Sequence, residues 1–258
     1  MQFPCQRPRA SRSPAATVVA RRECEINSGV DVERTSVAAG EPARAAVVVE
    51  LLVIAAFAAV FLIAFQARPG YVDLLLAMTA VAFIALGYKR SRRLWEAQPT
   101  DHSSRRQRLA ASSRGTAVFT LSAALVLLGV GFVSGYTAGG LSAAAGRIAN
   151  WHLAAAVLLY LPWAWLQQFV FQFYLLGRLL YLLPLPAAVA LTAAAFSMVH
   201  FPRAPVMAAT LVAGAVWALL YRRYRTLVPL AVSHAVLGAA LHYWAFGRDL
   251  LASWLGTA

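Results

Sequence analysis

Long apolar runs are the feature that most restricts how this chain can fold. One of them, residues 116–135, reads TAVFTLSAALVLLGVGFVSG and contains no charged side chain. A run of about 20 apolar residues is long enough to cross a bilayer as a helix. Because lipid offers no hydrogen bonds to the backbone, helices are the only structures that can satisfy such runs. The sequence therefore predicts an all-α, polytopic membrane helical bundle.

About seven transmembrane helices are predicted. They are expected at residues 45–65, 71–88, 116–135, 151–178, 186–201, 205–221 and 227–246. The first three fall within residues 44–135, and a loop rich in Gly and Ala at 136–150 separates them from the rest. The fourth is long, so it is expected to be either tilted or broken near Pro162. Residues 1–43 are predicted to be a disordered basic tail, and residues 247–258 a C-terminal tail.

The distribution of charge predicts how the chain lies in the membrane. Its 258 residues include 23 Lys and Arg but only 10 Asp and Glu, and the basic residues cluster between the spans, above all in a loop at 89–115. The positive-inside rule makes this loop cytoplasmic. Counted from a cytoplasmic N-terminus, twelve loop Lys and Arg, Arg178 among them, lie inside and four lie outside. We expect a multi-pass protein of the cell (inner or plasma) membrane. Anionic lipid accounts for the basic cluster, and nucleic acid is not expected as a partner.

Polar side chains recur in the last four spans. Gln167 and Gln168 lie in the fourth, His200 ends the fifth, and His234 lies within the seventh. Polar groups at membrane depth usually face a protein interior, a cavity or a site. The alternative is a neutral histidine that only hydrogen-bonds a neighbouring helix. A serine nucleophile is also possible, since Ser233 precedes His234 and a further serine lies near His200, although hydroxyl residues are also common at helix contacts.

Two classes of chemistry lack residues in this region. No Asp or Glu occurs between His102 and Arg248, so no carboxylate base is available there. A zinc site uses three or four His, Cys or carboxylate ligands, and only His200 and His234 are plausible. Neither a metal nor another cofactor is expected.

Three motifs in this region carry a resemblance. They are Gln167-Gln168-Phe-Val-Phe-Gln172, Phe196-Ser-Met-Val-His200 and His234-Ala-Val-Leu-Gly238. Their order and spacing over residues 151–246 resemble the CPBP family of intramembrane endopeptidases, of the CAAX-processing and bacteriocin-immunity type. That family carries Glu-Glu-x-x-x-Arg, Phe-x-x-x-His and His-x-x-x-Asn in the same order. The resemblance implies an intramembrane protease core at 151–246.

The resemblance also implies a role for each motif position, and the departures from the family pattern bear on the chemistry. Four residues stand at the family's catalytic positions, and three more complete its motifs. The catalytic positions are Gln167, Gln168, His200 and His234, and the others are Gln172, Phe196 and Gly238. In the family the first glutamate is thought to activate water, the histidines assist, and the asparagine helps to stabilise the oxyanion. Glutamine cannot take the proton, and losing a positioned general base typically costs about 10²–10⁴ in rate. Arg178 cannot replace the missing arginine, because it lies about 240° around the helix from Gln172.

These observations leave three functions open. The first is a CPBP-like intramembrane endopeptidase with a variant site, in which a histidine serves as base. The second is a catalytically inactive pseudoprotease that keeps the cavity and binds a membrane partner. The third is a transporter of small solutes or lipids. For the first two, the expected partners are membrane lipid and a membrane-associated or lipidated peptide or protein.

Overall fold

The computed structural model describes residues 44–56, 59, 78–79, 82, 85, 87–89, 91–96 and 104–255. The chain divides into two compact units, residues 1–64 and 65–258. In the first unit residues 44–56 are helical, where the first span is predicted. The tail at 1–43 and most of the span at 71–88 lie outside the described residues.

Every regular element in the described part of the second unit is helical, as the apolar runs predict. Beyond a short helical segment at 91–96, the elements are α3 (Arg105–Ile148), α4 (His152–Gln168), η1 (Phe169–Leu175), α5 (Leu176–Leu182), α6 (Leu185–Met198), α7 (Ala204–Tyr224), α8 (Val228–Ala240), η2 (Leu241–Ala245) and α9 (Leu250–Leu255). The elements η1 and η2 are π-helices.

The first residues of these helices explain where they begin. Ser104 and Gln107 form a reciprocal capping box at the start of α3, which satisfies backbone N–H groups that have no partner inside the helix. Helices α6, α7 and α8 each have a proline in their first turn. There the missing N–H is not needed and the fixed φ favours the helix.

The prediction of a loop at residues 136–150 is wrong. Helix α3 continues to Ile148 and changes direction only at Gly139 and Gly140, the second of which has φ 72°. Glycine adopts this left-handed conformation without the steric penalty of a Cβ atom. Gly135 lets the two arms of α3 meet, since a Cβ there would lie 2.8 Å from the Cα of Ala144. The Gly and Ala content thus encodes a tight corner between two helical arms.

The fourth predicted span continues without a break at Pro162. Helix α4 runs through this proline, and the irregularity comes later, at η1. Together α4, η1 and α5 form one helical stretch of 31 residues, His152–Leu182. A π-helix shifts the register of the side chains that follow it and often occurs at functional sites.

Four helices in the described ranges are long and apolar enough to cross a membrane, so the predicted number of about seven is not confirmed. They are Arg105–Ile148, His152–Leu182, Ala204–Tyr224 and Val228–Ala245. Helix α6 is apolar but has only 14 residues, fewer than the roughly 17 to 25 that a span needs. Beyond the last span, the expected C-terminal tail contains helix α9.

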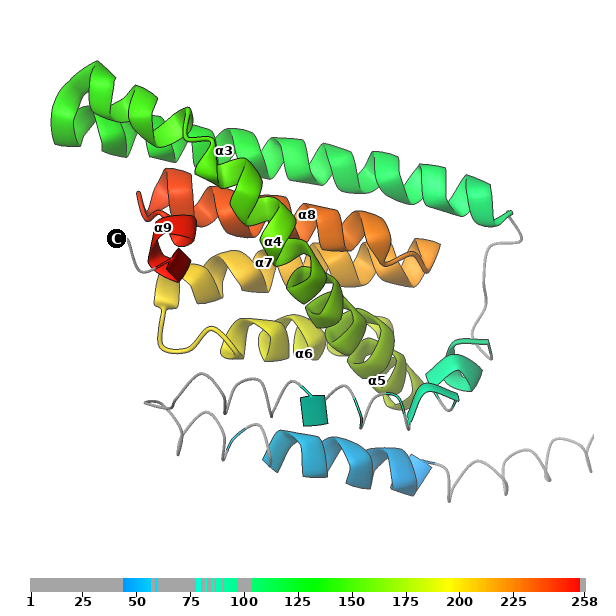
Figure 1. The fold of residues 1–258 in the computed structure, drawn as a ribbon. Coiled ribbons are helices and arrows are strands. Elements are labelled where there is room, and N and C mark those ends of the chain that lie inside the picture. Colours follow the sequence, from blue (N-terminus) through cyan, green and yellow to red (C-terminus); the bar gives the residue numbers. More distant parts are fainter. Residues whose placement is uncertain are drawn as a thin grey trace, which may run out of the picture. The chain divides into compact units, whose positions relative to one another are not determined.

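Helix α8 packs against α3, α4 and η2. Helix α3 lies along α8 and also contacts α7, while α6 packs against α7 (Figure 1). The stretch from α4 to α5 crosses the other helices obliquely and packs on α8 through α4. The core at these crossings includes Phe196, Trp217 and Leu230, which are almost completely buried.

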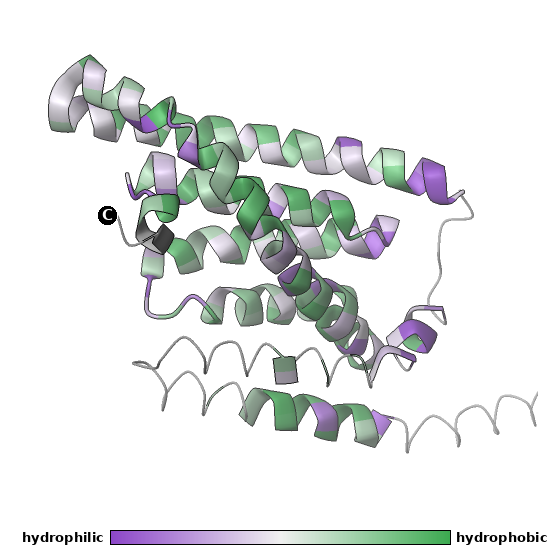
Figure 2. Cartoon of the chain, viewed as in Figure 1, coloured by the Kyte–Doolittle hydropathy of each residue, from purple (hydrophilic) through white to green (hydrophobic). Residues whose placement is uncertain are grey.

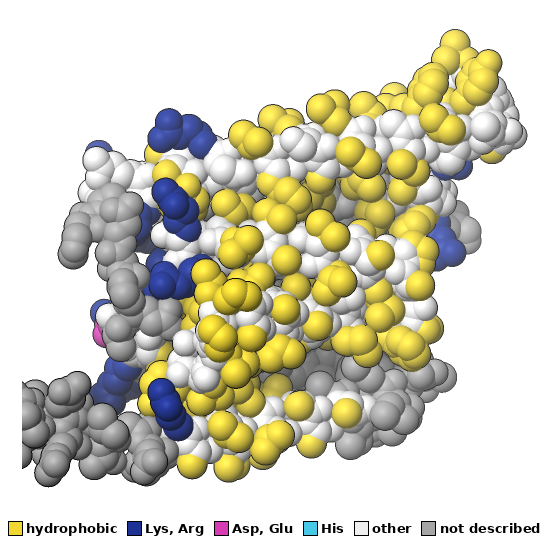
Figure 3. All heavy atoms as spheres, turned by 180° about the vertical axis from the view of Figure 1, so that it is seen from behind, with side chains coloured by type: hydrophobic (Ala, Val, Ile, Leu, Met, Phe, Trp, Pro, Cys, Tyr) yellow, Lys and Arg dark blue, Asp and Glu magenta, His cyan; other side chains and the backbone are white. Residues whose placement is uncertain are grey.

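The surface of this unit separates apolar and basic side chains. Hydrophobic residues cover the middle of the helices, and hydrophilic ones lie mainly toward their ends (Figure 2). Because α3 begins near the turn where α7 ends, the arginines of both elements lie at one edge, where Figure 3 shows a row of basic side chains. Arg178 was counted among the loop arginines on the cytoplasmic side, and this assignment is wrong. The residue is fully buried in α5, where it donates to the Ser91 hydroxyl and the Tyr174 carbonyl.

Candidate functional site

The residues of the three motifs lie on four neighbouring elements. Gln167 and Gln168 end α4, and Gln172 follows in η1. Phe196 lies in α6, His200 in the turn after it, and both His234 and Gly238 in α8. Helix α4 packs on α8, and α6 contacts η1. Residues more than 30 positions apart in the sequence are thereby brought to one region of the bundle.

The ring of Phe196 connects the two histidines. It meets His200 edge-on at a centroid distance of 5.7 Å and His234 at 5.3 Å. Trp217, which no motif indicated, packs 5.0 Å from the His234 ring and 5.8 Å from Phe196. Edge-to-face contacts at these distances are favourable for aromatic rings. Phe196 therefore acts as a packing residue that positions both imidazoles.

Tyr160 joins Gln167 to His234. Its hydroxyl lies 3.1 Å from Gln167 Oε1, to which it donates, and 3.3 Å from His234 Nε2. A phenol has one hydrogen to donate, so in this arrangement Nε2 carries the hydrogen and donates to the phenol oxygen. The sequence analysis missed Tyr160, although it lies seven residues before Gln167 and hence on the same face of the helix. Its hydroxyl completes a continuous chain from amide to phenol to imidazole.

Gly238 makes room for this tyrosine. A Cβ atom at position 238 would lie 3.2 Å from Tyr160 Cε1 and 4.0 Å from His234 Cδ2. The family pattern has asparagine here, and in this chain a tyrosine ring occupies the adjoining space.

Gln168 and Gln172 do not join the hydrogen-bonded chain. Both side chains are fully buried, and none of their four amide atoms has a hydrogen-bond partner among the described residues. A buried amide without a partner costs about 1–3 kcal/mol. Neither residue lines the cavity described next. The structure therefore separates Gln167, which contacts the histidine region through Tyr160, from the other two glutamines.

A cavity of about 500 Å³ lies between α3, α7 and α8. His200, His234, Tyr160 and Gly238 line it, together with aromatic and aliphatic side chains. Its volume falls in the range usual for sites that bind small ligands. No carboxylate lies in its wall, since every lining residue is described and none is acidic. The two histidines thus face a largely apolar space.

The two serines near the histidines have structural partners. Ser233 accepts from the Trp217 indole at 3.1 Å and lies 2.7 Å from the Thr120 hydroxyl. Ser197 donates to the Met207 carbonyl at 2.8 Å. Neither hydroxyl lines the cavity. These contacts support a role in helix packing, which was the alternative to a nucleophile.

The side chain of Trp95 packs against η1 and forms a hydrogen bond with it. Its indole donates to the Phe173 carbonyl at 2.7 Å and packs against Gly177, where a Cβ atom would lie 2.7 Å from the indole nitrogen. The Tyr221 ring meets it edge-on at 5.2 Å, and the Arg225 guanidinium lies 3.9 Å from its centroid. Burial lowers the pKa of Arg225 to about 10, so this arginine stays charged at neutral pH. The irregular helix that carries Gln172 is therefore held by specific contacts.

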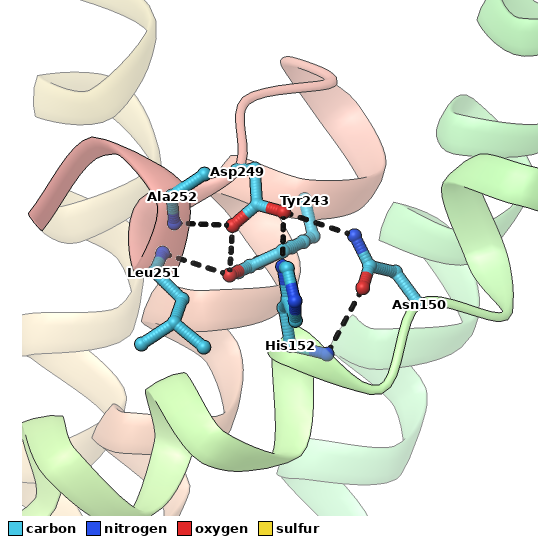
Figure 4. Close-up of polar contacts among 6 residues, drawn as sticks. All are labelled: Asn150, His152, Tyr243, Asp249, Leu251 and Ala252. Carbon is cyan, nitrogen blue, oxygen red and sulfur yellow. Dashed lines mark hydrogen bonds and ion pairs between the residues drawn. The ribbon is translucent and has the colours of Figure 1, made fainter. Parts of the chain in front are cut away.

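A polar cluster at the opposite end of the bundle fixes the C-terminal helix α9. Asp249 accepts from His152 Nδ1 at 2.5 Å, from Asn150 at 3.2 Å, from the Tyr243 hydroxyl at 2.8 Å and from the Ala252 N–H at 2.9 Å (Figure 4). Burial alone would raise the pKa of the Asp249 carboxyl, but these hydrogen bonds together hold it well below its ordinary value. His152, the first residue of α4, is thus a partner of the carboxylate. Leu250 follows Asp249 and lines the cavity, so the cluster also holds one part of the cavity wall.

Metal-ligand groups are absent from the described part of the chain: no three His, Cys, Asp or Glu side chains come together there. His200, His234 and His242 share the cavity wall, but they do not form a cluster that could hold a metal ion. The arrangement can orient a polar group through Tyr160 and the histidines, and it can enclose an apolar one.

The apolar helices and a family match together fit a membrane-embedded, CAAX-type protease. Residues 148–240 match the family model described as type II CAAX prenyl endopeptidase Rce1-like. The resemblance to the CPBP family is confirmed over this segment, which contains all three motifs. Searches of curated proteins and of solved structures give no match.

Proposed function

We propose that this chain is a membrane-embedded, CAAX-protease-like protein that binds a membrane-associated, lipid-modified peptide without hydrolysing it. The observation that carries the proposal is the composition of the cavity wall. It holds His200, His234 and Tyr160 but no carboxylate, and glutamines stand at the positions of the family's glutamates. A positioned general base is thus missing where the family match predicts one, while an apolar space for a lipid group is present.

The hydrogen-bonded chain supports a binding role. An amide, a phenol and an imidazole that satisfy one another need no charge in the membrane interior, where an unpaired charge is costly. Gln167 and His234 are held through Tyr160 at fixed distances of 3.1 and 3.3 Å. The same groups present donors and acceptors near an apolar cavity, which is the usual composition of a binding site.

Peptide binding is tested with purified protein in vesicles and a prenylated peptide that carries a photoreactive group. We expect cross-linking in the wild type and its loss in Ala213→Phe, which places a ring into the cavity wall. Ala208→Phe is the matched control, because it adds the same ring to an exposed position of α7 outside the cavity. Equal cross-linking in both variants would refute binding in this cavity.

Hydrolysis is tested with the same peptide and with an unmodified one. We expect no product from the wild type. Gln167→Glu would place a carboxylate beside the Tyr160 hydroxyl, and we expect this variant to gain detectable cleavage, because a positioned base typically contributes about 10²–10⁴ in rate. Wild-type cleavage that His200→Ala and His234→Ala abolish, and that His152→Ala leaves intact, would contradict the proposal.

That last outcome would support the second candidate, an endopeptidase in which a histidine acts as the base. The observation that favours it is the contact of His234 with Tyr160, because an imidazole whose tautomer is fixed by a neighbour can orient water. The same variants therefore decide between a binding protein and an enzyme.

We further propose a multi-pass orientation with the N-terminus in the cytoplasm. The basic edge formed where α3 begins and α7 ends supports it, because basic residues favour the cytoplasmic side. Cys5 and Cys24 are the only cysteines of the chain, and both lie before the first predicted span. We expect them to resist a membrane-impermeant maleimide in intact cells and to react after permeabilisation; labelling of intact cells would reverse the orientation.

A further inference from the structure

Three basic side chains lie close together in the cavity wall. His200, Arg203 and His242 all line it, and His200 lies close enough to interact electrostatically with the other two. No ion pair joins Arg203 to a described carboxylate. His242 donates through Nδ1 to the Gly238 carbonyl at 2.9 Å, so its other ring nitrogen is left for a further partner. The Nε2 atom of His200 is buried and has no hydrogen-bond partner in the described ranges.

The rest of the wall is apolar and reaches the surface between two helices. Val126 of α3 and Val212 of α7 line the cavity, yet their side chains are 66% and 63% exposed. In a membrane-embedded bundle such exposed aliphatic side chains face lipid. The cavity is therefore open toward the acyl chains of the bilayer between α3 and α7, while its basic groups lie at one end.

We propose that this cavity binds an anionic single-chain lipid, with the acyl chain between α3 and α7 and the carboxylate at His200, Arg203 and His242. Charge complementarity favours an anionic head group. These three residues offer two imidazoles and one guanidinium as hydrogen-bond donors, and the wall has no acidic side chain. The apolar wall and the lateral opening select a chain that comes from the membrane. A guanidinium near a membrane interface pairs readily with a carboxylate.

This ligand fits the position of each basic residue. Arg203 is exposed at the turn before α7, so its charge can remain in contact with water while the side chain reaches the cavity. His200 and His242 are half-buried and lie nearer the apolar space. Leu250 closes the wall at α9. A carboxylate held here would be partly shielded from water, where a charge-assisted hydrogen bond is strongest.

The proposal concerns the same cavity as the proposed peptide binding, but it needs no peptide, and the two can fail separately. If the prenylated peptide cross-links and the fatty acid does not bind, the lipid inference fails alone. If the fatty acid binds and the peptide does not, the proposed function fails alone.

The test measures equilibrium binding of radiolabelled palmitate to the purified, delipidated full-length protein in detergent. Hexadecanol is the uncharged probe of the same chain length, and acetate carries the head group alone. We expect palmitate to bind at least about tenfold more tightly than hexadecanol, because a hydrogen bond to a charged group typically contributes at least this factor. Acetate should not compete at equal concentration.

Two pairs of variants locate the site. Arg203→Gln is expected to weaken palmitate about tenfold and to leave hexadecanol unchanged. Its matched control is Arg248→Gln, which removes an exposed arginine outside the cavity. Val212→Trp is expected to block both probes, whereas Leu219→Trp, at another exposed position of α7, should block neither.

Because Val212 and Leu219 are both exposed, neither tryptophan has to enter a packed core, and folding can be compared by circular dichroism. Equal affinity for palmitate and hexadecanol would overturn the head-group assignment, as would equal effects of the two arginine variants. Unchanged palmitate binding in a folded Val212→Trp protein would overturn the place of the acyl chain.

Discussion

Replacing Gly177 with alanine tests whether the indole of Trp95 holds the π-helix η1. A Cβ atom at this position would lie 3.0 Å from Cε2 of the indole and 2.7 Å from its nitrogen, and the second distance is closer than real Cβ atoms approach other heavy atoms. Trp95 is only 5% exposed and is enclosed by Tyr221 and Arg225. The indole therefore cannot move aside without losing contacts.

The expected cost has three contributions. Overpacking a tight core typically costs about 1–3 kcal/mol. If the indole moves, the buried Phe173 carbonyl loses its 2.7 Å hydrogen bond, which costs about 1–3 kcal/mol more. Replacing glycine by alanine in a helix returns about 0.5–1 kcal/mol. We expect Gly177→Ala to destabilise the protein by about 1–5 kcal/mol, which lowers Tm by about 2–4 °C for each kcal/mol in a chain of this size.

The matched control is Gly129→Ala. Gly129 also lies within a helix, but a Cβ there would have no atom within 4 Å beyond its own helix backbone and chain neighbours, so we expect an unchanged or slightly higher Tm. Thermal unfolding of both variants is followed by circular dichroism in one detergent. Trp95→Phe should rescue part of the loss in Gly177→Ala, because a smaller ring relieves the overlap, and the double variant should deviate from additivity. Equal Tm values for the two glycine variants, or strict additivity in the double variant, would refute this account.

Three further changes test other parts of the second unit. Tyr160→Phe should destabilise it by about 1–3 kcal/mol, because both hydrogen bonds of the phenol are lost and their partners, the half-buried Gln167 and the buried His234, are left unpaired; chemical denaturation measures this, and no loss would contradict the bridging role. The pKa of the Asp249 carboxyl is depressed in the folded state, so its stabilisation is complete above the unfolded pKa of about 4 and is lost as pH falls further. Thermal unfolding from pH 7 to 3 should therefore show an acid-induced loss that Asp249→Asn lacks, and identical pH profiles would argue against it. Gln172→Met should be neutral or stabilising by up to about 1 kcal/mol, since it removes buried amide atoms that have no partner among the described residues; a loss above 1 kcal/mol would mean that the amide is satisfied.

The helical class could be read from the sequence, and so could the interest of two polar positions within apolar runs. Apolar length alone requires helices in lipid, and polar side chains such as His200 and His234 are costly in an apolar run unless they face a protein interior. Both histidines do line a cavity. Helix starts were also encoded locally, by Ser104 and by prolines in first turns.

The bounds of the helices could be predicted from the sequence less well than the helical class. The segment 136–150 has the composition of a loop, yet it forms two helical arms, because only Gly140 takes a left-handed φ and the small residues around it allow close packing. Arg178 has the appearance of a loop cation, but it is buried inside the bundle, where its guanidinium donates to Ser91 and to the Tyr174 carbonyl. Both outcomes depend on which neighbours a residue meets, which local sequence does not specify.

The division among the three glutamines was decided by the tertiary structure. Their spacing places them on one helical stretch and makes them look like a single motif. Packing of α4 on α8 then brings Tyr160 between Gln167 and His234, while Gln168 and Gln172 are buried outside the cavity. Sequence determined that the segment from His102 to Arg248 contains no carboxylate of its own. Only the fold decided which uncharged groups meet, because hydrogen bonds between helices depend on distances of about 3 Å that sequence spacing cannot fix across separate elements.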